Sequence, residues 1–439
     1  MDELNKALTT ATSSGAALLP EDLEPAIVEY LGRQMPLFSM LPKRTATSKT
    51  HEYTVRTAVP DAWFEGELTP ANAAASSYER RSVQLKIARV WGGVSGFQQR
   101  MSEQFVNALA TEIEGSVEGL AELMEYAVLW GNDTDTKQYD GIEAFIINDS
   151  TAQKTIGNGG NVNDVNGVIT LSDLDDMLDA VETGRGTTND NKVIIASPQM
   201  ISKITGLQTK IQRTVQQIEF EGGFRMATYR GIPMVPSGFV RPAGTTTSPD
   251  VTATAAAGGS LADDTYYYRI ASVTRYGEQL VGGEDSATTA TTNNSVALSW
   301  TADSNAVLYK IYRGTTAGAD NLELLDVIAA KSYDSAGTVS GNVTSYTDDG
   351  TKTPVSSVKP LDPVSSVVEE TLFVVNLDPR RGAHLVGNMS PLGERLDTFV
   401  SYVPLAVTRS SFDYMIESFH ALVVPQPTLH AVARRVRVA

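Results

Sequence analysis

The stretch MSEQFVNALATEIEGSVEGLAELMEYAVLW, residues 101–130, carries the clearest helical pattern in the chain. Its apolar residues recur every three or four positions, which predicts one amphipathic helix. These residues are Met101, Phe105, Leu109, Ile113, Val117, Leu120, Met124 and Val128. At 1.5 Å per residue, such a helix spans roughly 45 Å. Because the stretch also holds six glutamates and no lysine or arginine, we expect an acidic face toward solvent.

The segment before this helix predicts a long two-stranded hairpin. Residues 50–59 and 81–89 alternate apolar and polar side chains, as half-buried strands do. Residues 61–77 between them show no period and include Trp63 and Phe64. An isolated hairpin is marginally stable in water. We therefore expect this one to lie on its own domain or on a neighbouring molecule.

Residues 1–45 predict a loose arm, since small polar residues and several prolines interrupt every apolar pattern there. One short helix is expected at 21–32, with Leu23, Ile27 and Leu31 on one face.

Residues 140–242 predict a compact unit of helices and strands. Turn-forming residues indicate a hairpin at 157–167, and leucines at helical spacing indicate a helix at 171–181. An apolar run predicts a buried strand at 193–196. Ser197 and Pro198 then suit the start of a helix that runs to about Leu207. A last strand, at 231–235, is expected at the edge of the sheet.

Residues 243–357 differ in composition from the sequence on either side. They are rich in Thr, Ser, Ala and Gly, and short stretches alternate at the period of a β-strand, as Val296, Leu298 and Trp300 do. This pattern predicts an all-β sandwich inserted into a mixed domain. Apolar strands of the outer domain resume at Leu372.

Charge and composition exclude several classes of protein. The net charge is −17, from 35 basic and 52 acidic residues, so a sequence-reading DNA-binding protein is not expected. The chain has no cysteine and no apolar run long enough for a membrane span. Arg434, Arg435 and Arg437 form a basic group, for which a solvated face is expected.

Catalytic patterns are missing. The closest approach to a nucleophile elbow, residues 93–97, has its second glycine one place early. Asp133, Asp135 and Asp140 resemble a calcium loop, but Lys137 stands where an oxygen ligand is required. We expect no catalytic residue, no metal and no cofactor.

The order of elements outside 243–357 resembles the major capsid protein of tailed bacteriophages, with the Hong Kong 97-type fold. The residues that carry the resemblance are Leu129-Trp130-Gly131-Asn132, Tyr139-Asp140-Gly141-Ile142, Tyr229 to Val235, and Phe419 to Val424 before Pro425 and Pro427. The resemblance implies an α+β fold with an arm, an extended loop, a long spine helix, and axial and peripheral domains.

The resemblance also implies domain boundaries. These are an N-terminal arm at 1–45, an extended-loop hairpin at 46–92, a peripheral domain with the spine helix at 93–139, an axial domain at 140–242, an inserted β-domain at 243–357, and a return to the axial and peripheral domains at 358–439.

The inserted segment resembles a fibronectin type III or immunoglobulin-like module, through Val296 to Trp300, Tyr309 to Gly314 and Tyr346 to Asp348. Its tyrosine-rich strand, 266–273, precedes these strands where the type III order would place it after them. The strand order is therefore open. We expect the module on the outer surface and dispensable for folding of the core.

The implied function is that of a shell subunit, made in the host bacterial cytoplasm and assembled into the virion capsid. Hexamers and pentamers of the chain would enclose double-stranded DNA, with a scaffolding protein and a portal as partners. Extended-loop residues expected to act in assembly are Trp63, Phe64, Glu65 and Glu67; weak, non-specific DNA contacts are expected from Arg33, Lys43, Arg44 and Lys49. Since no lysine lies between Lys49 and Lys86, the lysine cross-link of some family members is not expected.

Two alternatives stay open. The same fold could form an encapsulin-like compartment around a cargo enzyme, although the inserted module argues against it. A carbohydrate-binding adhesin is the second alternative, with the β-module contacting a host-surface glycan. Its candidate contacts are Tyr266, Tyr267, Tyr268, Tyr276 and Trp300, and packing into the module's core is the competing role for these aromatics.

Overall fold

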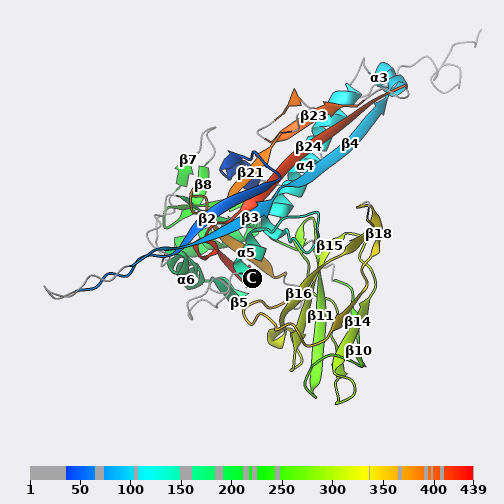
Figure 1. Cartoon of the computed structure of the whole chain (residues 1–439). Helices are drawn as coiled ribbons and strands as arrows, with labels where there is room; N and C mark the ends of the chain where they lie inside the picture. Colours follow the sequence, from blue (N-terminus) through cyan, green and yellow to red (C-terminus); the bar gives the residue numbers. More distant parts are fainter. Residues whose placement is uncertain are drawn as a thin grey trace, which may run out of the picture.

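A computed structural model shows a long ribbon backed by a helix, a projecting hairpin, a second sheet and a β-sandwich (Figure 1). It describes residues 36–64, 74–102, 107–148, 161–182, 191–210, 217–219, 225–242, 248–335, 337–363, 368–389, 394–396, 399–405 and 410–438. The helix expected at 21–32 lies outside these residues. None of the described helices is long and apolar enough to cross a membrane.

The helix expected at 101–130 is divided into α3, Gly96–Ser102, and α4, Ala108–Trp130. Asn107 has an extended backbone, and its side chain accepts a hydrogen bond from the Ala110 N–H, which makes it the N-cap of α4. An asparagine at this position satisfies a backbone donor that the helix start would leave unpaired. The expectation of one continuous helix was therefore wrong, although the register of its apolar face over α4 is confirmed.

Helix α4 lies along two long strands of a six-stranded sheet. The central strand is β24, Ser411–Val423, which pairs antiparallel with β4, Lys86–Ser95, from Ser411 opposite Ser95 to His420 opposite Lys86. The other strands are β1 (Lys43–Thr45), β21 (His384–Asn388), β23 (Val400–Pro404) and β22 (Glu394–Arg395). The apolar side of α4 is buried against this sheet.

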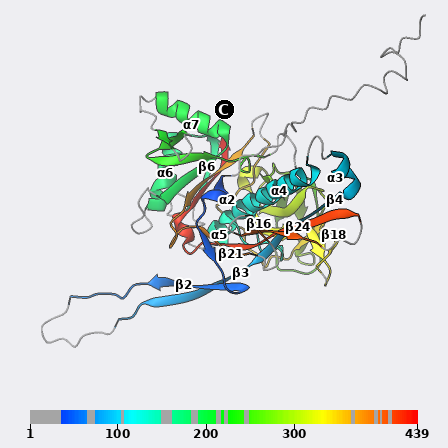
Figure 2. The ribbon, with the colours of Figure 1, turned by 90° about the horizontal axis from the view of Figure 1, so that it is seen from above.

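The hairpin consists of β2, Thr50–Ala58, and β3, Ser77–Gln84 (Figure 2). The strand expected at 81–89 is in fact two, because the chain leaves the hairpin at Leu85 and continues as β4 in the other sheet. The Leu85 N–H donates to the Lys49 carbonyl at 2.8 Å and closes the base of the hairpin.

A seven-stranded sheet forms the second part of the outer domain, in the order β5-β25-β20-β6-β9-β8-β7. Its strands are β5 (Val162–Val168), β25 (Ala431–Arg437), β20 (Glu370–Asn376), β6 (Lys192–Ala196), β9 (Ile232–Pro236), β8 (Arg225–Tyr229) and β7 (Gln217–Glu219). Its helices are α6 (Leu171–Glu182) and α7 (Pro198–Lys210). Short helices elsewhere are α2 (Leu37–Met40), α5 (Ile142–Asn148) and η3 (Pro427–Leu429).

The helix expected at 171–181, the strand expected at 193–196 and the helix expected to start at Ser197-Pro198 are confirmed as α6, β6 and α7. All five residues of β6 are buried, and the Ser197 hydroxyl accepts a hydrogen bond from the Met200 N–H at 3.1 Å as the cap of α7. Of the hairpin expected at 157–167, residues 157–160 lie outside the described residues, and residues 162–167 belong to β5, which runs parallel to β25. The expectation of an edge strand at 231–235 was wrong. Strand β9 pairs with both β6 and β8, so it is not an edge strand.

The segment 248–363 folds as two sheets that face each other. One contains β10 (Val251–Ala256), β14 (Ser295–Trp300) and β19 (Ser345–Asp348). The other contains β12 (Gly277–Glu278), β11 (Thr265–Thr274), β15 (Ala306–Gly314), β16 (Glu323–Ala329) and β13 (Asp285–Thr288). The small hairpin β17 (Lys331–Tyr333) and β18 (Val339–Asn342) and the 3₁₀ turn η2 (Ala319–Asn321) complete the segment.

Apolar side chains from both sheets fill the space between them. Trp300 of β14 is buried there, and its ring meets that of Tyr309 of β15 edge-on, with centroids 5.4 Å apart. Tyr268 lies in the same core, and its hydroxyl donates to the Asp348 carboxylate of the opposite sheet at 2.9 Å. The segment therefore has a core of its own.

The other face of the β11–β15 sheet belongs to the core of the outer domain. Val273, Leu308 and Leu324 share a continuous apolar cluster with Trp130 of α4 and Phe373 of β20. The expectation that the core would fold without residues 243–357 is therefore not supported, because their removal would expose this cluster to water.

One glycine shows how close the contact between these parts is. Gly277, at the β11–β12 turn, has φ of +99°, and a side chain there would lie 2.5 Å from the Phe239 carbonyl oxygen and 2.9 Å from the Trp130 indole nitrogen. Only glycine suits both the backbone and the space.

Truncation of Trp300 to alanine should lower the free energy of unfolding by about 3–5 kcal/mol, because it empties a large volume between the two sheets. Denaturant unfolding of the purified subunit measures this change. Trp91→Ala is the matched control, since that indole is 73% exposed, and it should alter stability by no more than ~0.5 kcal/mol. Equal effects of the two substitutions would contradict the assignment of Trp300 to the core.

Candidate assembly interface

The hairpin has one supported end and one unsupported end. Near its base, Tyr53, Val83 and Leu85 pack on a small cluster formed by Ala46, Val386 and Val423. Toward the tip, both faces of the two strands are exposed to solvent. A two-stranded sheet with both faces exposed to solvent gains little stability from the burial of apolar surface. The distal hairpin therefore has no packing surface among the described residues of its own subunit.

The expected assembly residues lie beyond this unsupported end. Trp63 and Phe64 are both exposed, with Trp63 at 53%; Glu65 and Glu67 lie outside the described residues. Val59 and Tyr78 are exposed nearby. Exposed apolar side chains on a projecting element are typical of a surface used in protein–protein contacts.

Further exposed apolar side chains, not foreseen from the sequence, lie on the long ribbon and on the helix that follows β4. They are Ile87 and Trp91 on β4, Phe97 and Met101 on α3, and Phe412 on β24. Val83 belongs to the hairpin and Ile87 to the six-stranded sheet, which a single strand at 81–89 could not indicate. The Ser95 hydroxyl caps α3 by accepting the Gln98 N–H at 3.1 Å, so it has a structural role.

The residues expected to contact DNA are only partly described. Arg33 lies outside the described residues. Lys43 and Arg44 sit on β1, where the Lys43 ammonium lies 4.5 Å from the centre of the Phe38 ring and Arg44 donates to the Pro379 carbonyl. Lys49 is exposed in the turn before β2. The structure brings three of the four residues to one end of the hairpin.

The acidic residues considered for calcium bind the backbone instead. The Asp140 carboxylate accepts the Asp133 N–H at 3.0 Å, and the Asp135 carboxylate accepts the Lys137 N–H at 3.1 Å. Across the residues that the structure describes, no group of three or more His, Asp or Glu side chains could hold a metal ion.

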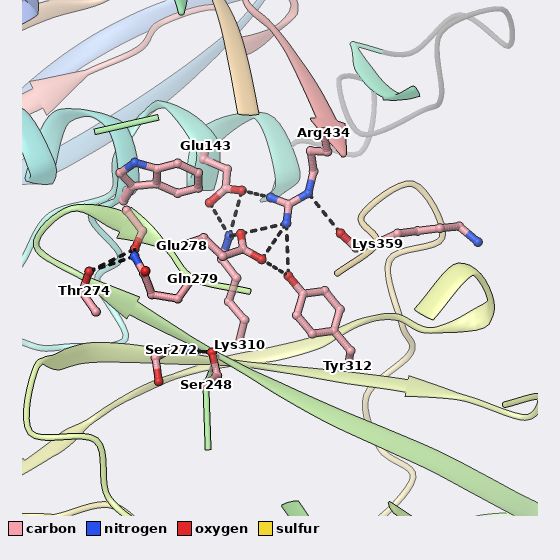
Figure 3. A network of polar contacts seen from close by, with 12 residues as sticks. Glu143, Ser248, Ser272, Thr274, Glu278, Gln279, Lys310, Tyr312, Lys359 and Arg434 are labelled. Atoms are coloured by element: carbon pink, nitrogen blue, oxygen red, sulfur yellow. Dashed lines mark hydrogen bonds and ion pairs between the residues drawn. The ribbon is translucent and has the colours of Figure 1, made fainter. Parts of the chain in front are cut away.

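A buried network of charges joins the β-sandwich to the outer domain (Figure 3). Lys310 of β15 lies 2.6 Å from carboxylate oxygens of both Glu143 of α5 and Glu278 of β12. Arg434 of β25 pairs with the same two glutamates, at 2.7 Å from Glu278, and the Tyr312 hydroxyl donates to Glu278 at 2.6 Å. Two cations therefore balance two anions.

The expectation of a solvated arginine face at the C-terminal strand was wrong. Arg434 and Arg435 are buried, and Arg435 pairs with Asp164 of β5 and Asp320 of η2. Arg437 pairs with Glu369 at 2.6 Å. The partners come from segments far away in the sequence, so the pattern of arginines alone could not reveal them.

The charges of the network set the ionisation of its carboxylates. Burial alone would raise the pKa of Glu278, but the neighbouring Arg434 and Lys310 outweigh burial and lower that pKa to about 2. Since the folded-state pKa is depressed, the stabilisation from this carboxylate is present above its ordinary pKa and is lost as the pH falls through about 2.

Replacing Arg434 with methionine should cost about 3–5 kcal/mol of folding free energy, because it leaves two buried carboxylates with one cation. The control is Arg80→Met, which removes an exposed ion pair with Glu52, 3.3 Å apart, worth at most ~1 kcal/mol. Urea unfolding of both variants gives the comparison. If Arg434→Met unfolds at the same urea concentration as the control, the network does not hold the two parts together.

A second buried carboxylate holds the chain that leads out of the arm. Glu125 of α4 accepts the Leu37 N–H at 3.1 Å and the Phe38 N–H at 2.8 Å, at the start of α2. Beside it, the His420 ring contacts Phe38 edge-on and Nε2 lies 3.1 Å from the Tyr139 hydroxyl. Burial raises the pKa of Glu125 to about 7, opposed by these backbone hydrogen bonds.

Glu125→Gln should flatten the pH dependence of stability between pH 5 and pH 8. A raised folded-state pKa gives a contribution that is complete below the ordinary value of 4.5 and is lost as the pH rises through about 7. The wild-type subunit should therefore lose up to about 3 kcal/mol over this range from Glu125. Glu122→Gln, on the same helix but partly exposed, should keep the wild-type slope. Unfolding curves at several pH values decide between these outcomes, and equal slopes for the two variants would contradict the assignment.

Comparison with solved structures defines the class of fold. The holo-SrpI encapsulin complex from Synechococcus elongatus PCC 7942 matches 97% of this chain and 95% of that chain, with 12% identity and a TM-score of 0.51. A chain of Gordonia phage Cozz covers 99% of this chain and 96% of its own length at 12% identity, with a TM-score of 0.47. The capsid of a native GTA particle covers 98% of both at 9% identity, with a TM-score of 0.48. The fold is Hong Kong 97-like, as in capsids and encapsulins.

The model of the SU10 major capsid protein family matches residues 5–237, more than half of the chain. The chain belongs to this family and is a major capsid protein of a tailed phage. The family is one of structural shell proteins. No curated protein is significantly similar to the chain.

Proposed function

We propose that the chain assembles into hexamers and pentamers of an icosahedral shell around double-stranded DNA. In this shell the β2–β3 hairpin would contact a neighbouring subunit. The observation that carries this proposal is the unsupported distal hairpin, with Trp63 and Phe64 exposed beyond it. Family membership makes other copies of the chain the available partners. A neighbouring subunit would cover the two wet faces and make the hairpin stable.

The proposed shell uses DNA, a scaffolding protein and a portal as further partners. For DNA, the support is a basic group of Lys43, Arg44 and Lys49 near the hairpin base, on a chain whose net charge of −17 opposes tight binding. Such contacts are weak, independent of sequence and screened by salt. Arg33 belongs to the same proposal through its place in the arm.

For residues 243–357 we propose an immunoglobulin-like module that forms part of the outer surface. Two facing sheets with a core around Trp300 support the first statement. The shared apolar cluster and the Arg434 network indicate that the module is built into the subunit. Tyr266, Tyr268 and Trp300 are buried, and Tyr267 and Tyr276 are half-buried, which favours packing over glycan contact for these aromatics.

Deleting Trp63 to Ser76 and closing the hairpin with a short Gly-Ser turn should leave a folded subunit that no longer forms shells. The deletion removes the exposed aromatics but not the base contacts of Tyr53 and Val83. Negative-stain microscopy and sedimentation velocity measure assembly. The control is Val339→Ser, which removes an exposed apolar side chain from β18 and should assemble normally.

Shells formed at wild-type yield by the deleted chain would show that the hairpin tip has no part in assembly. The contents of wild-type particles distinguish a virion shell from an encapsulin-like compartment. Packaged double-stranded DNA supports the virion shell, whereas particles without nucleic acid support an encapsulin-like compartment.

A further inference from the structure

A short helix anchors the N-terminal part of the chain to the body of the subunit. Helix α2 lies beside α4 (Figure 2), and Leu37, Phe38 and Leu41 are buried there in the main apolar cluster. Residues 1–35 precede this segment in the chain, and β1 begins directly after it at Lys43. The docking of α2 therefore sets where residues 1–35 join the body of the subunit.

The polar part of this anchor is the carboxylate of Glu125, a fully buried residue of α4. Its two oxygens accept backbone N–H groups at the start of α2, from Leu37 at 3.1 Å and from Phe38 at 2.8 Å. Neither donor carries a charge, and no described lysine or arginine forms an ion pair with Glu125. When this carboxylate is ionised, it is a buried charge with no cation in contact with it, which is unfavourable.

Three further titratable groups lie around this anchor, and each comes from a different neighbouring segment. His420 of β24 contacts Phe38 edge-on, and burial, assisted by the Lys43 ammonium, lowers the pKa of His420 to about 4. The Tyr139 hydroxyl lies 3.1 Å from the His420 Nε2, and burial raises the pKa of Tyr139. Both rings are therefore neutral near pH 7. Lys43 of β1 is charged, and its ammonium lies over the Phe38 ring, 4.5 Å from the ring centre. Helix α2 itself has no titratable side chain.

Opening of α2 would expose the Glu125 carboxylate to water. In the docked state, burial raises the pKa of Glu125 from its ordinary value of 4.5 to about 7, although the two backbone hydrogen bonds oppose this shift. Because the docked state has the higher pKa, docking is strongest below the ordinary value and weakens as the pH rises through about 7. The burial of Leu37 and Phe38 does not depend on pH, so loss of the proton loosens the docked helix and does not abolish docking.

We propose that α2 is a pH-sensitive latch, which stays docked on α4 while Glu125 is protonated and opens more often once Glu125 is ionised. Strand β1 stays paired with β21, so the opening is confined to the segment before Lys43. In the open state, residues 36–42 add up to about 25 Å to the reach of residues 1–35. The latch is a property of the single subunit, so it does not depend on the proposed shell.

Hydrogen exchange of the full-length subunit, followed by mass spectrometry at several pH values from 5 to 8, tests the latch. At each pH the measured rates are divided by the rates of the unstructured chain, which removes the chemical pH dependence of exchange. Peptides that cover residues 36–41 report on α2, and peptides that cover β6, which is buried throughout, report on the sheet. Local opening predicts lower protection for α2 than for β6 at every pH.

In the wild-type subunit, the protection of residues 36–41 should fall by up to about 70-fold from pH 5 to pH 8, as the docked and ordinary pKa values of Glu125 require. Glu125→Gln keeps the size of the side chain without its charge, so protection should change less than about twofold. The control Glu122→Gln, at a partly exposed position of α4, should keep the wild-type profile. Phe38→Ala retains the carboxylate, so it should lower protection at every pH and keep the slope.

A flat wild-type profile would overturn the proposal, and so would a Glu125→Gln profile as steep as that of the wild type. Equal protection of α2 and β6 at every pH would also overturn it, because α2 would then open only when the whole subunit unfolds. The wild-type profile requires no substitution, so the proposal stays testable if a variant fails to fold.

Discussion

The guanidinium of Arg434 lies where the C-terminal strand, helix α5 and the β-sandwich meet, and the structure depends on its pairing there. Taking a charge out of water costs several kcal/mol, which only well-placed partners can repay. Glu143 and Glu278 provide them from two different elements, and Lys310 of a third element pairs with the same two carboxylates. The geometry is satisfied only when these segments are in place together, so the network fixes how the inserted segment sits on the outer domain.

The hairpin presents the opposite situation. Its base is closed by local packing, while its distal half has no surface of its own to bury. In the proposed shell, the missing surface would belong to another copy of the chain, and the hairpin would gain stability from contact with that copy.

Structural features set by residues close together in the sequence could be predicted. Features that depend on partners far away in the sequence could not. The apolar period predicted α4, the Ser197-Pro198 pair predicted the start of α7, and the order of elements pointed to the capsid fold. Asn107 is a residue type that favours the N-cap position, but the helical spacing of apolar residues continues on both sides of it, so the sequence predicted one unbroken helix. The burial of Arg434 and the interior position of β9 depend on strands that follow much later, so local alternation and charge could not show them.

The pairing of β5 with β25 has a consequence for the timing of synthesis. The Asn161 side chain donates to the His430 carbonyl, 269 residues further along the chain. At 5–20 residues per second, the ribosome needs roughly 15 to 50 s to reach the second partner after the first. During this interval the nascent chain lacks β25, and Glu143 and Glu278 lack one of their two cations. The seven-stranded sheet is therefore complete only after the whole inserted segment and β25 have been translated.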